Sequence, residues 1–526
     1  MKTLLVLWLV SVAADDVTTS EPGKNERPNI ILFLVDDMGW QDTSLPFHSV
    51  KTPYNTVYHT PNMERLANQG VIFTQAYTAS PVCTPSRVSI MTGQYPARNN
   101  ITNWTLRNSV EEQETARGDY PLLSPSQWNV SGLQPDDVTL AGLLRENGYR
   151  TVHIGKAHFG ALGTPGADPG NLGFDLNIAG HAAGAPGSYY GMDDFKRRPG
   201  EESHWDVPGL EAYHGTDTYL TEALTLEALK VMENLAGSRE PFFLNMAHYA
   251  IHTPIQPDPN FIGHYQNLDP VEAAYASMIE GMDHSLGNIL DKLQELDIAD
   301  HTLIIFTSDD GALSAHTRGQ TILGTGLNTH NLPLMSGKGS AYEGGSRIPL
   351  IMAWGNPDDR THSESQSQSH SRSRHILNLE QGSQIHTPVI SHDLFPTIIE
   401  LTGSEIPEDL PVDGASLSDV IETGGNMQER ALFWHYPHKW GPTGPGLDPF
   451  TSVRKGDWKL IYFYRDRSWE LYDISEDITE TRNVLHTNRV HAKQLAGLMI
   501  DWMREVDARL PVDRTSGEPV PFPHFE

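Results

Sequence analysis

Cysteine is almost absent from this chain of 526 residues, which has a single one, Cys83. One thiol cannot form a disulfide within the chain, so the fold is not built on a disulfide framework. A lone cysteine is either an inert filler of the core or a residue kept for its chemistry. The residues that surround Cys83 favour the second role.

Basic residues are also scarce. The chain has 37 Lys and Arg against 67 Asp and Glu, which gives a formal net charge of -30. Nucleic acids and anionic membrane surfaces are bound through basic protein surface. We therefore expect neither as a partner, and any site for an anion must supply its own local positive charge.

Long hydrophobic runs are missing except for a short one near the N-terminus. An apolar segment over 4–12 follows Met1-Lys2 and ends on small residues at 11–14. This pattern is typical of a signal peptide over residues 1–14, and it is too short for a membrane anchor, which needs about 20 apolar residues. The sequence predicts an exported protein, periplasmic or secreted, with no membrane span.

Apolar runs that alternate with amphipathic segments predict an α/β fold. The continuous apolar run over 29–35 is typical of a strand that is buried on both faces. Strands separated by helices form a large, mostly parallel sheet that helices cover on both sides. Further strands are expected at 71–73, 149–154, 241–246, 303–306 and 348–353, and helices at 61–68, after Cys83, and at 140–146, 217–235 and 271–296.

The pattern changes near residue 431, where strands follow one another without helices between them. Four strands and a final amphipathic helix over 490–506 predict a small C-terminal antiparallel sheet with a helix. We therefore divide the chain into a main domain at 25–430 and a subdomain at 431–526. Within the main domain, the Gly- and Pro-rich segment 165–215 is expected to be a long loop, and the Ser-rich segment 358–375 a disordered insertion.

Polar residues follow several of the predicted strands. Ligands of parallel sheets bind beyond the carboxyl ends of the strands, so these residues are expected to form one composite site. They are Asp36 and Asp37, Lys156 and His158, His248 and His252, and Asp309 and Asp310. The four carboxylates suit a hard cation with oxygen ligands, most simply Ca²⁺. In the alternative interpretation, each acidic pair caps a helix or faces solvent.

Cys83 opens the run Cys83-Thr84-Pro85-Ser86-Arg87. Pro85 suits the first turn of a helix, and Ser86 is able to cap its free amides. Together with Arg87, this helix terminus is expected to attract an anion toward Cys83.

This pentad resembles the C-x-P-S-R signature of the type I sulfatases. Three further segments resemble motifs of the same family, and the resemblance covers nearly all of the chain after the N-terminal segment. They are the G-K-x-H element at 155–158, the H-x-P element at 252–254, and the K-G and E-G-G-x-R-x-P elements within 338–349. The resemblance implies an alkaline-phosphatase-like fold in which the C-terminal sheet forms part of the substrate cleft.

The resemblance also implies a cofactor chemistry. In this family a formylglycine-generating enzyme oxidises the cysteine of the signature to formylglycine, here at Cys83. The ligands of Ca²⁺ would be the modified residue 83 with Asp36, Asp37, Asp309 and Asp310. Many family members have a neutral Asn as the Ca²⁺ ligand at the position of Asp310. The carboxylate adds a negative charge there, so the sequence leaves open whether Asp310 takes the role of that neutral ligand.

The resemblance also assigns the catalytic roles of the family to individual residues of this chain. Arg87, Lys156 and Lys338 would stabilise charge on the sulfuryl oxygens. His158 would remove a proton from the second hydroxyl of the hydrated aldehyde, and His252 would assist the leaving oxygen. His248 is interpreted as structural, and Glu343 with Arg347 as an ion pair that holds a loop.

The expected substrate is a sulfated polysaccharide or oligosaccharide, because export, acidity and the resemblance all favour one. His181 and His435 are candidate substrate contacts, with Trp205 and Trp440 as candidate stacking partners; in the alternative interpretation they pack in the core. Two other functions stay open. One is a phosphoester or phosphonate hydrolase of the same superfamily, and the other is an inactive carbohydrate-binding relative, which a broken site would indicate.

Overall fold

The computed structural model describes residues 27–525 apart from 112–118, 199, 239, 315–317, 319–328, 357–376 and 442–443. The predicted signal peptide and the predicted Ser-rich insertion both lie outside these described residues. Among the helices within them, none combines the length and the hydrophobicity that a membrane crossing requires.

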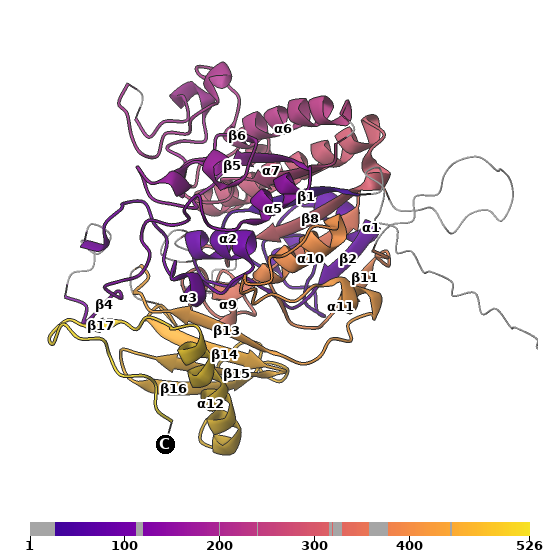
Figure 1. The fold of residues 1–526 in the computed structure, drawn as a ribbon. Coiled ribbons are helices and arrows are strands. Elements are labelled where there is room, and N and C mark those ends of the chain that lie inside the picture. Colours follow the sequence, from indigo (N-terminus) through magenta and orange to yellow (C-terminus); the bar gives the residue numbers. More distant parts are fainter. Residues whose placement is uncertain are drawn as a thin grey trace, which may run out of the picture.

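An eight-stranded mixed sheet forms the centre of the molecule (Figure 1). Neighbouring strands β8, β1, β7, β5 and β6 are parallel, whereas β10 is antiparallel to both β8 and β2. The mostly parallel sheet expected from the sequence is therefore confirmed. In order across the sheet, the strands are β11 (Ser383–Ile385), β2 (Gly70–Phe73), β10 (Leu350–Trp354), β8 (Thr302–Ser308), β1 (Asn29–Val35), β7 (Phe242–Ala247), β5 (Arg150–Gly155) and β6 (Leu176–Ile178).

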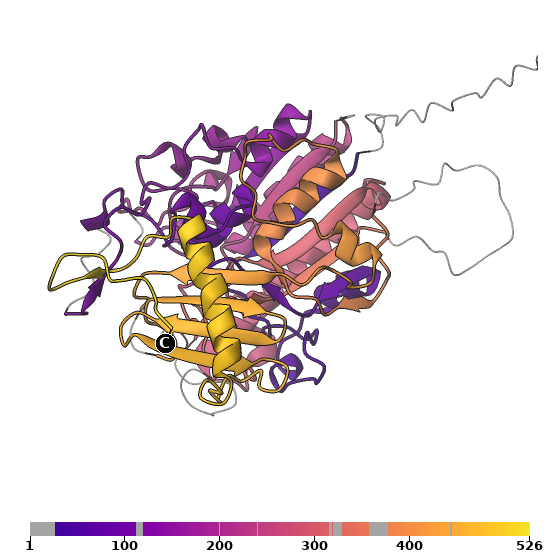
Figure 2. The ribbon, with the colours of Figure 1, turned by 60° about the horizontal axis from the view of Figure 1, so that its bottom comes forward.

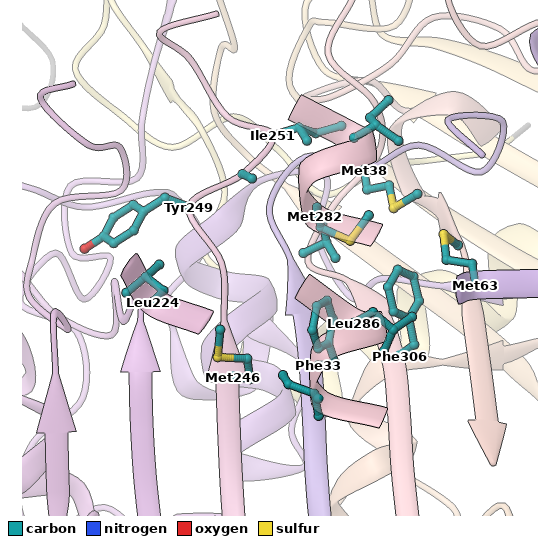
Figure 3. Packing of buried hydrophobic residues seen from close by; sticks show 14 of the residues in the cluster. Phe33, Met38, Met63, Leu224, Met246, Tyr249, Ile251, Met282, Leu286 and Phe306 are labelled. Carbon is teal, nitrogen blue, oxygen red and sulfur yellow. The ribbon is translucent and has the colours of Figure 1, made fainter. Parts of the chain in front are cut away.

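Helices cover both faces of this sheet, as alternate residues of β1 indicate. Phe33 belongs to a buried cluster with α1 (Pro61–Gln69), α6 (Leu220–Ala236) and α7 (Pro270–Glu295), and Figure 3 shows it near Met282 and Leu286 of α7. Leu32 belongs to a second cluster on the opposite face. The helices of that face are α2 (Cys83–Thr92), α5 (Leu140–Glu146) and α10 (Leu394–Thr402). Burial on both sides explains why β1 is apolar at every position but its first.

A four-stranded antiparallel sheet with one helix forms the C-terminal part of the chain. Its strands, in order, are β13 (Ala431–Tyr436), β14 (Phe450–Lys455), β15 (Trp458–Phe463) and β16 (Ser468–Asp473). Helix α12 (Arg489–Glu505) lies across these strands in Figure 2. It buries Leu495, Met499 and Met503 in the same cluster as the sheet, so the smaller sheet and helix expected from the sequence are present.

The Gly- and Pro-rich segment 165–215 differs from expectation in one respect. It consists largely of turns and short 3-10 helices, as a long structured loop should, but it also contains the strand β6. Strand β6 has three residues and pairs with β5 at the edge of the large sheet. Its residues alternate as apolar, polar and apolar, but three residues are too few for alternation to predict a strand.

Buried charges connect the C-terminal sheet to the short helix α9 (Glu343–Ser346) of the preceding part of the chain. Glu343 of this helix lies 3.3 Å from Arg347 and 3.0 Å from Lys459 of β15. Lys459 also lies 3.0 Å from Glu480. Burial alone would raise the pKa of Glu343, but Lys459, Arg454 and Arg347 lower it to about 2. The expected ion pair between Glu343 and Arg347 is confirmed, and Lys459 extends it into the C-terminal subdomain.

We expect Lys459→Met to lower the free energy of unfolding by about 3 kcal/mol, because it leaves Glu480 buried without its cation while Glu343 keeps Arg347. Urea titration followed by tryptophan fluorescence measures the change. Lys455→Met is the matched control, since Lys455 is a half-buried lysine of the neighbouring strand β14. If both variants unfold at the urea concentration of the wild type, the buried ion pairs of Lys459 do not stabilise the folded protein.

Candidate active site

The polar residues that follow the strands meet at the carboxyl edge of the large sheet. Asp36 and Asp37 follow β1, and Asp309 and Asp310 follow β8, its parallel neighbour. All four carboxylates are fully buried. The composite site expected from the strand ends is therefore present as a spatial cluster.

Cys83 is the first residue of helix α2, which is buried along its whole length. No side chain caps this helix, so the expected capping role of Ser86 is wrong. Ser86 lies a full turn inside the helix, and its hydroxyl instead approaches the carbonyl oxygens of Ser80 and Val82 at 2.8 and 2.9 Å. It thereby fixes the loop that leads into Cys83.

Three buried cations pair with the four carboxylates. Lys156 Nζ lies 2.6 Å from Asp36 Oδ1, and Arg87 Nε lies 2.7 Å from Asp309 Oδ2. Lys338 donates to Asp37 and lies 3.5 Å from Asp310. Arg87 also donates to the carbonyl oxygen of Lys156 at 2.7 Å, which links α2 to the end of β5.

The carboxylates fit a divalent cation. Asp36 Oδ2, Asp37 Oδ2 and both side-chain oxygens of Asp310 are buried without a hydrogen-bond partner among the described residues. Burial raises the pKa of Asp36 and of Asp310 well above the usual range, although Lys156 and Lys338 oppose the shift. Ligand atoms of Asp37, Asp309 and Asp310 lie within 4.8 Å of one another, as do those of Asp36, Asp309 and Cys83. A hard cation with oxygen ligands would satisfy these orphaned atoms and offset their charge.

The Cys83 side chain lies beside this cluster, with its Sγ 3.0 Å from Lys338 Nζ. Burial by itself would raise the pKa of the thiol. Lys156 and Lys338, together with hydrogen bonding between Cys83 and the two histidines His158 and His252, outweigh burial and hold the pKa of the thiol well below its usual range. Position 83 is therefore built to carry a negatively charged atom.

His158 approaches Cys83 with a defined tautomer. Its Nε2 lies 2.8 Å from the carbonyl oxygen of Thr105, which only accepts, so Nε2 carries the proton and the buried Nδ1 keeps its lone pair. Strand β5 ends at Gly155, and His158 has a positive φ of 56°. A left-handed turn after the strand brings His158 to Cys83.

The two histidines that follow β7 have different positions. His252 Nδ1 lies 2.9 Å from the carbonyl oxygen of Thr253, so this nitrogen donates and Nε2 faces Asp37 Oδ2 at 3.5 Å. His248 is fully buried, with Nε2 3.0 Å from the Ser285 hydroxyl, and burial lowers its pKa to about 3. The structural interpretation of His248 is confirmed by this placement.

A cavity of about 380 Å³ opens above Cys83. His158, His252 and Lys338 line it, whereas Arg87 and Lys156 lie beneath it and face the carboxylates. The remaining lining residues are Trp104, Gly184, Ala185, Pro186, Gly187, Arg197, Trp205, Thr253, Pro254 and Trp440. Trp205 and Trp440 were candidates from the sequence. Trp104 and Arg197 were missed, since no local pattern distinguishes them.

The two histidines expected to contact substrate are absent from the described lining of the cavity. Both ring nitrogens of His435 are engaged, with Thr451 Oγ1 at 2.7 Å and the Arg509 carbonyl oxygen at 2.8 Å. His435 therefore packs inside the C-terminal subdomain, which is the alternative that the sequence left open. The backbone carbonyl oxygen of His181 accepts a hydrogen bond from the backbone N–H of His158 at 3.1 Å.

Comparison with known families agrees with this site. The sulfatase family model matches residues 28–404, and a model described as the C-terminal part of N-sulphoglucosamine sulphohydrolase matches residues 354–506. The chain therefore belongs to the sulfatase family, with its alkaline-phosphatase-like fold, and is an enzyme that hydrolyses sulfate esters.

Individual relatives are similar over nearly the whole chain. The N-acetylgalactosamine-6-sulfatase of Canis lupus familiaris is 28% identical over 97% of this chain and 86% of its own length. A sulfatase of Formosa agariphila is 28% identical over 95% of this chain and 93% of its own. Ps i-CgsB, also solved in complex with k-i-k-neocarrahexaose, superposes with a TM-score of 0.69 and 26% identity, covering 90% of this chain and 92% of that one.

Proposed function

We propose that this enzyme removes sulfate from a sulfated carbohydrate by means of formylglycine at position 83 and a bound Ca²⁺. The observation that carries the proposal is the convergence of Cys83 and two histidines on one cavity, beside four buried carboxylates of which three have orphaned oxygens. Export from the cell and maturation by a formylglycine-generating enzyme belong to the same proposal. Arg87, Lys156 and Lys338 are its charge-stabilising residues.

The cofactors would be held by residues already in place. Asp36, Asp37, Asp309 and Asp310, together with residue 83, would hold Ca²⁺, whose charge would favour an ionised hydroxyl at residue 83. Formylglycine supplies a hydrated aldehyde, in which one hydroxyl bonds to sulfur and the other allows the sulfate to be expelled.

The chain's own cations divide into two layers. Lys338 lines the cavity and contacts position 83, so it would bind a sulfuryl oxygen directly. Arg87 and Lys156 face the carboxylates and would act from beneath, by holding Asp309 and Asp36 in place. Fixed charges of this kind contribute roughly 2 to 4 kcal/mol each to transition-state stabilisation.

The histidines would move the protons. His252, doubly protonated beside Asp37, would give a proton from Nε2 to the sugar oxygen as its bond to sulfur breaks, because its Nδ1–H is engaged by the Thr253 carbonyl oxygen. His158 would take a proton at Nδ1, because its Nε2 is occupied by Thr105. His252 donates one proton and His158 accepts one, while the proton lost by the first hydroxyl passes to solvent, so water and the sulfate ester yield an alcohol, sulfate and one proton.

A carbohydrate substrate suits the walls of the cavity. Trp104, Trp205 and Trp440 offer aromatic surface on which sugar rings stack, and the cavity volume lies at the lower end of the range for small-molecule sites. Two of the relatives support such a substrate: one is named for N-acetylgalactosamine-6-sulfate hydrolysis, and Ps i-CgsB was solved with a neocarrahexaose. Sulfate release from a panel of defined sulfated oligosaccharides, with the matching phosphate esters as comparison, tests the proposal.

We expect exhaustive chelation to abolish sulfate release, because the charge that would favour an ionised hydroxyl at residue 83 is lost and four buried carboxylates then face only three buried cations. Adding Ca²⁺ should restore the rate, and calorimetry should detect one bound ion per chain. Glu280→Gln is the matched control, because Glu280 is a buried acid away from the cavity whose partners are His59 and His264. A metal-free enzyme that keeps its full rate would contradict the calcium assignment.

A further inference from the structure

Arg197 is an exposed cation in the wall of the cavity that no acidic residue engages. Among the described residues, no carboxylate lies within ion-pair distance of its guanidinium, whereas its neighbour Arg198 pairs with Glu201 at 3.4 Å. The other lysine or arginine of the wall, Lys338, is committed to Asp37 and Cys83. Arg197 is therefore the cation of the wall that is available to a ligand.

The composition of the wall makes this cation unusual. The chain carries 67 acidic residues, yet none of the described residues that line the cavity is acidic. An arginine on such a protein would ordinarily attract a carboxylate from its own chain. A wall that presents Arg197 and excludes carboxylates attracts anions from outside.

Backbone hydrogen bonds hold Arg197 in the cavity wall that also includes Trp205. The Arg197 N–H donates to Asp206 Oδ1 at 3.2 Å, and the Ser203 N–H donates to Asp206 Oδ2 at 2.9 Å. Asp206 thus uses both carboxylate oxygens to close the loop and leaves the guanidinium free. The loop brings a planar cation and an aromatic residue into the lining of one cavity, a combination that suits a charged sugar.

A strip of small residues connects Arg197 to the reacting groups. A Cβ on Gly184 would lie 2.3 Å from Cε1 of the His158 ring, and a Cβ on Gly187 would lie 2.3 Å from the backbone nitrogen of Arg197. The segment 184–187 therefore contacts His158 at one end and Arg197 at the other. His158 and Arg197 line the same cavity, so a ligand whose sulfate lies beside His158 shares that cavity with Arg197.

We infer that Arg197 binds a second anionic group, a sulfate or a carboxylate, on the sugar whose first sulfate is cleaved at residue 83. This inference rests on the proposed function and narrows its substrate class to sugars with two negative groups. The planar fork of Arg197 matches the oxygens of either group, and an unpaired guanidinium needs no internal ion pair to be broken first.

Two matched substrate pairs test the inference, each differing by one charged group. The first is a κ- and an ι-carrageenan disaccharide, which differ by one sulfate. The second is a chondroitin 6-sulfate disaccharide and its carboxyl-reduced form, which differ by a carboxylate. In at least one pair, kcat/KM of the wild type should be about tenfold higher for the more charged member, the size of one charge-assisted hydrogen bond. Arg197→Gln should abolish this preference, mainly through KM.

Arg198→Gln is the matched control, because Arg198 is an adjacent exposed arginine that already has a partner. It should keep the preference, and Arg197→Lys should keep part of it. If the wild type treats both members of both pairs alike, or if Arg197→Gln discriminates as the wild type does, the inference is overturned while the proposed function stands. If the wild type releases no sulfate from these sugars or from 4-nitrophenyl sulfate, the proposed function fails, and the inference fails with it.

Discussion

Cys83→Ser is expected to lower steady-state sulfate release by a factor on the order of 10⁴ or more, as the loss of a nucleophile does in other hydrolases. The reason is chemical: a serine has one hydroxyl, whereas the hydrated aldehyde has two. The surrounding Lys338, His158 and His252 remain in the variant, so the first transfer of sulfate to residue 83 is still possible. The sulfate would then stay on the protein.

Rapid-mixing assays with 4-nitrophenyl sulfate and intact-protein mass spectrometry measure this result. Cys83→Ser should release at most one nitrophenol per chain and retain the sulfate, while the control Cys83→Ala should do neither. Mass spectrometry of the wild-type peptide that contains residue 83 should find the aldehyde in active enzyme. A fully active preparation in which residue 83 is entirely unmodified cysteine would contradict the formylglycine assignment.

The second large effect should distinguish the catalytic role of His252 from that of His158. His252→Ala should lower the rate by about 10² to 10⁴-fold for sugar sulfates, whose leaving alcohols need a proton, and by much less for an aryl sulfate. His158→Ala should lower the rate for both kinds of substrate, because its Nδ1 would accept the proton that drives sulfate off the protein. Only the His158 variant should accumulate protein-bound sulfate.

Single-turnover kinetics with a sugar sulfate and an aryl sulfate, followed by quenching and intact-mass measurement, distinguish these outcomes. His248→Ala is the matched control, since His248 follows the same strand as His252 but is buried against Ser285. Equal losses for both substrates in both variants, with no sulfate retained by either, would refute this division of roles.

Much of the fold could be predicted because it depends on local patterns. The run over 29–35 became β1, and the amphipathic segment 140–146 became α5, both with unchanged bounds. Continuous hydrophobicity reports burial on both faces, and that burial requires helices on both sides of the sheet. The direction of β10 was beyond such reasoning, because an apolar run of five residues has the same composition whichever way it runs.

The candidate site, like the fold, could be predicted from the sequence only in part. The sequence by itself determined that Asp36, Asp37, Asp309 and Asp310 would meet, because the carboxyl ends of neighbouring parallel strands lie at one edge of a sheet. It also singled out Cys83, whose pentad is a contiguous motif.

Only the tertiary structure decided which side chains face the cavity and in what state. Arg197 and Trp104 reach it from loops whose paths no local pattern fixes, whereas His435 is drawn into the packing of its own sheet. The tautomer of His158 depends on the carbonyl oxygen of Thr105, which lies 53 positions away in the chain. Strand ends are set by periodicity along the chain, but the contacts of a loop side chain are set by whichever distant segments fold against it.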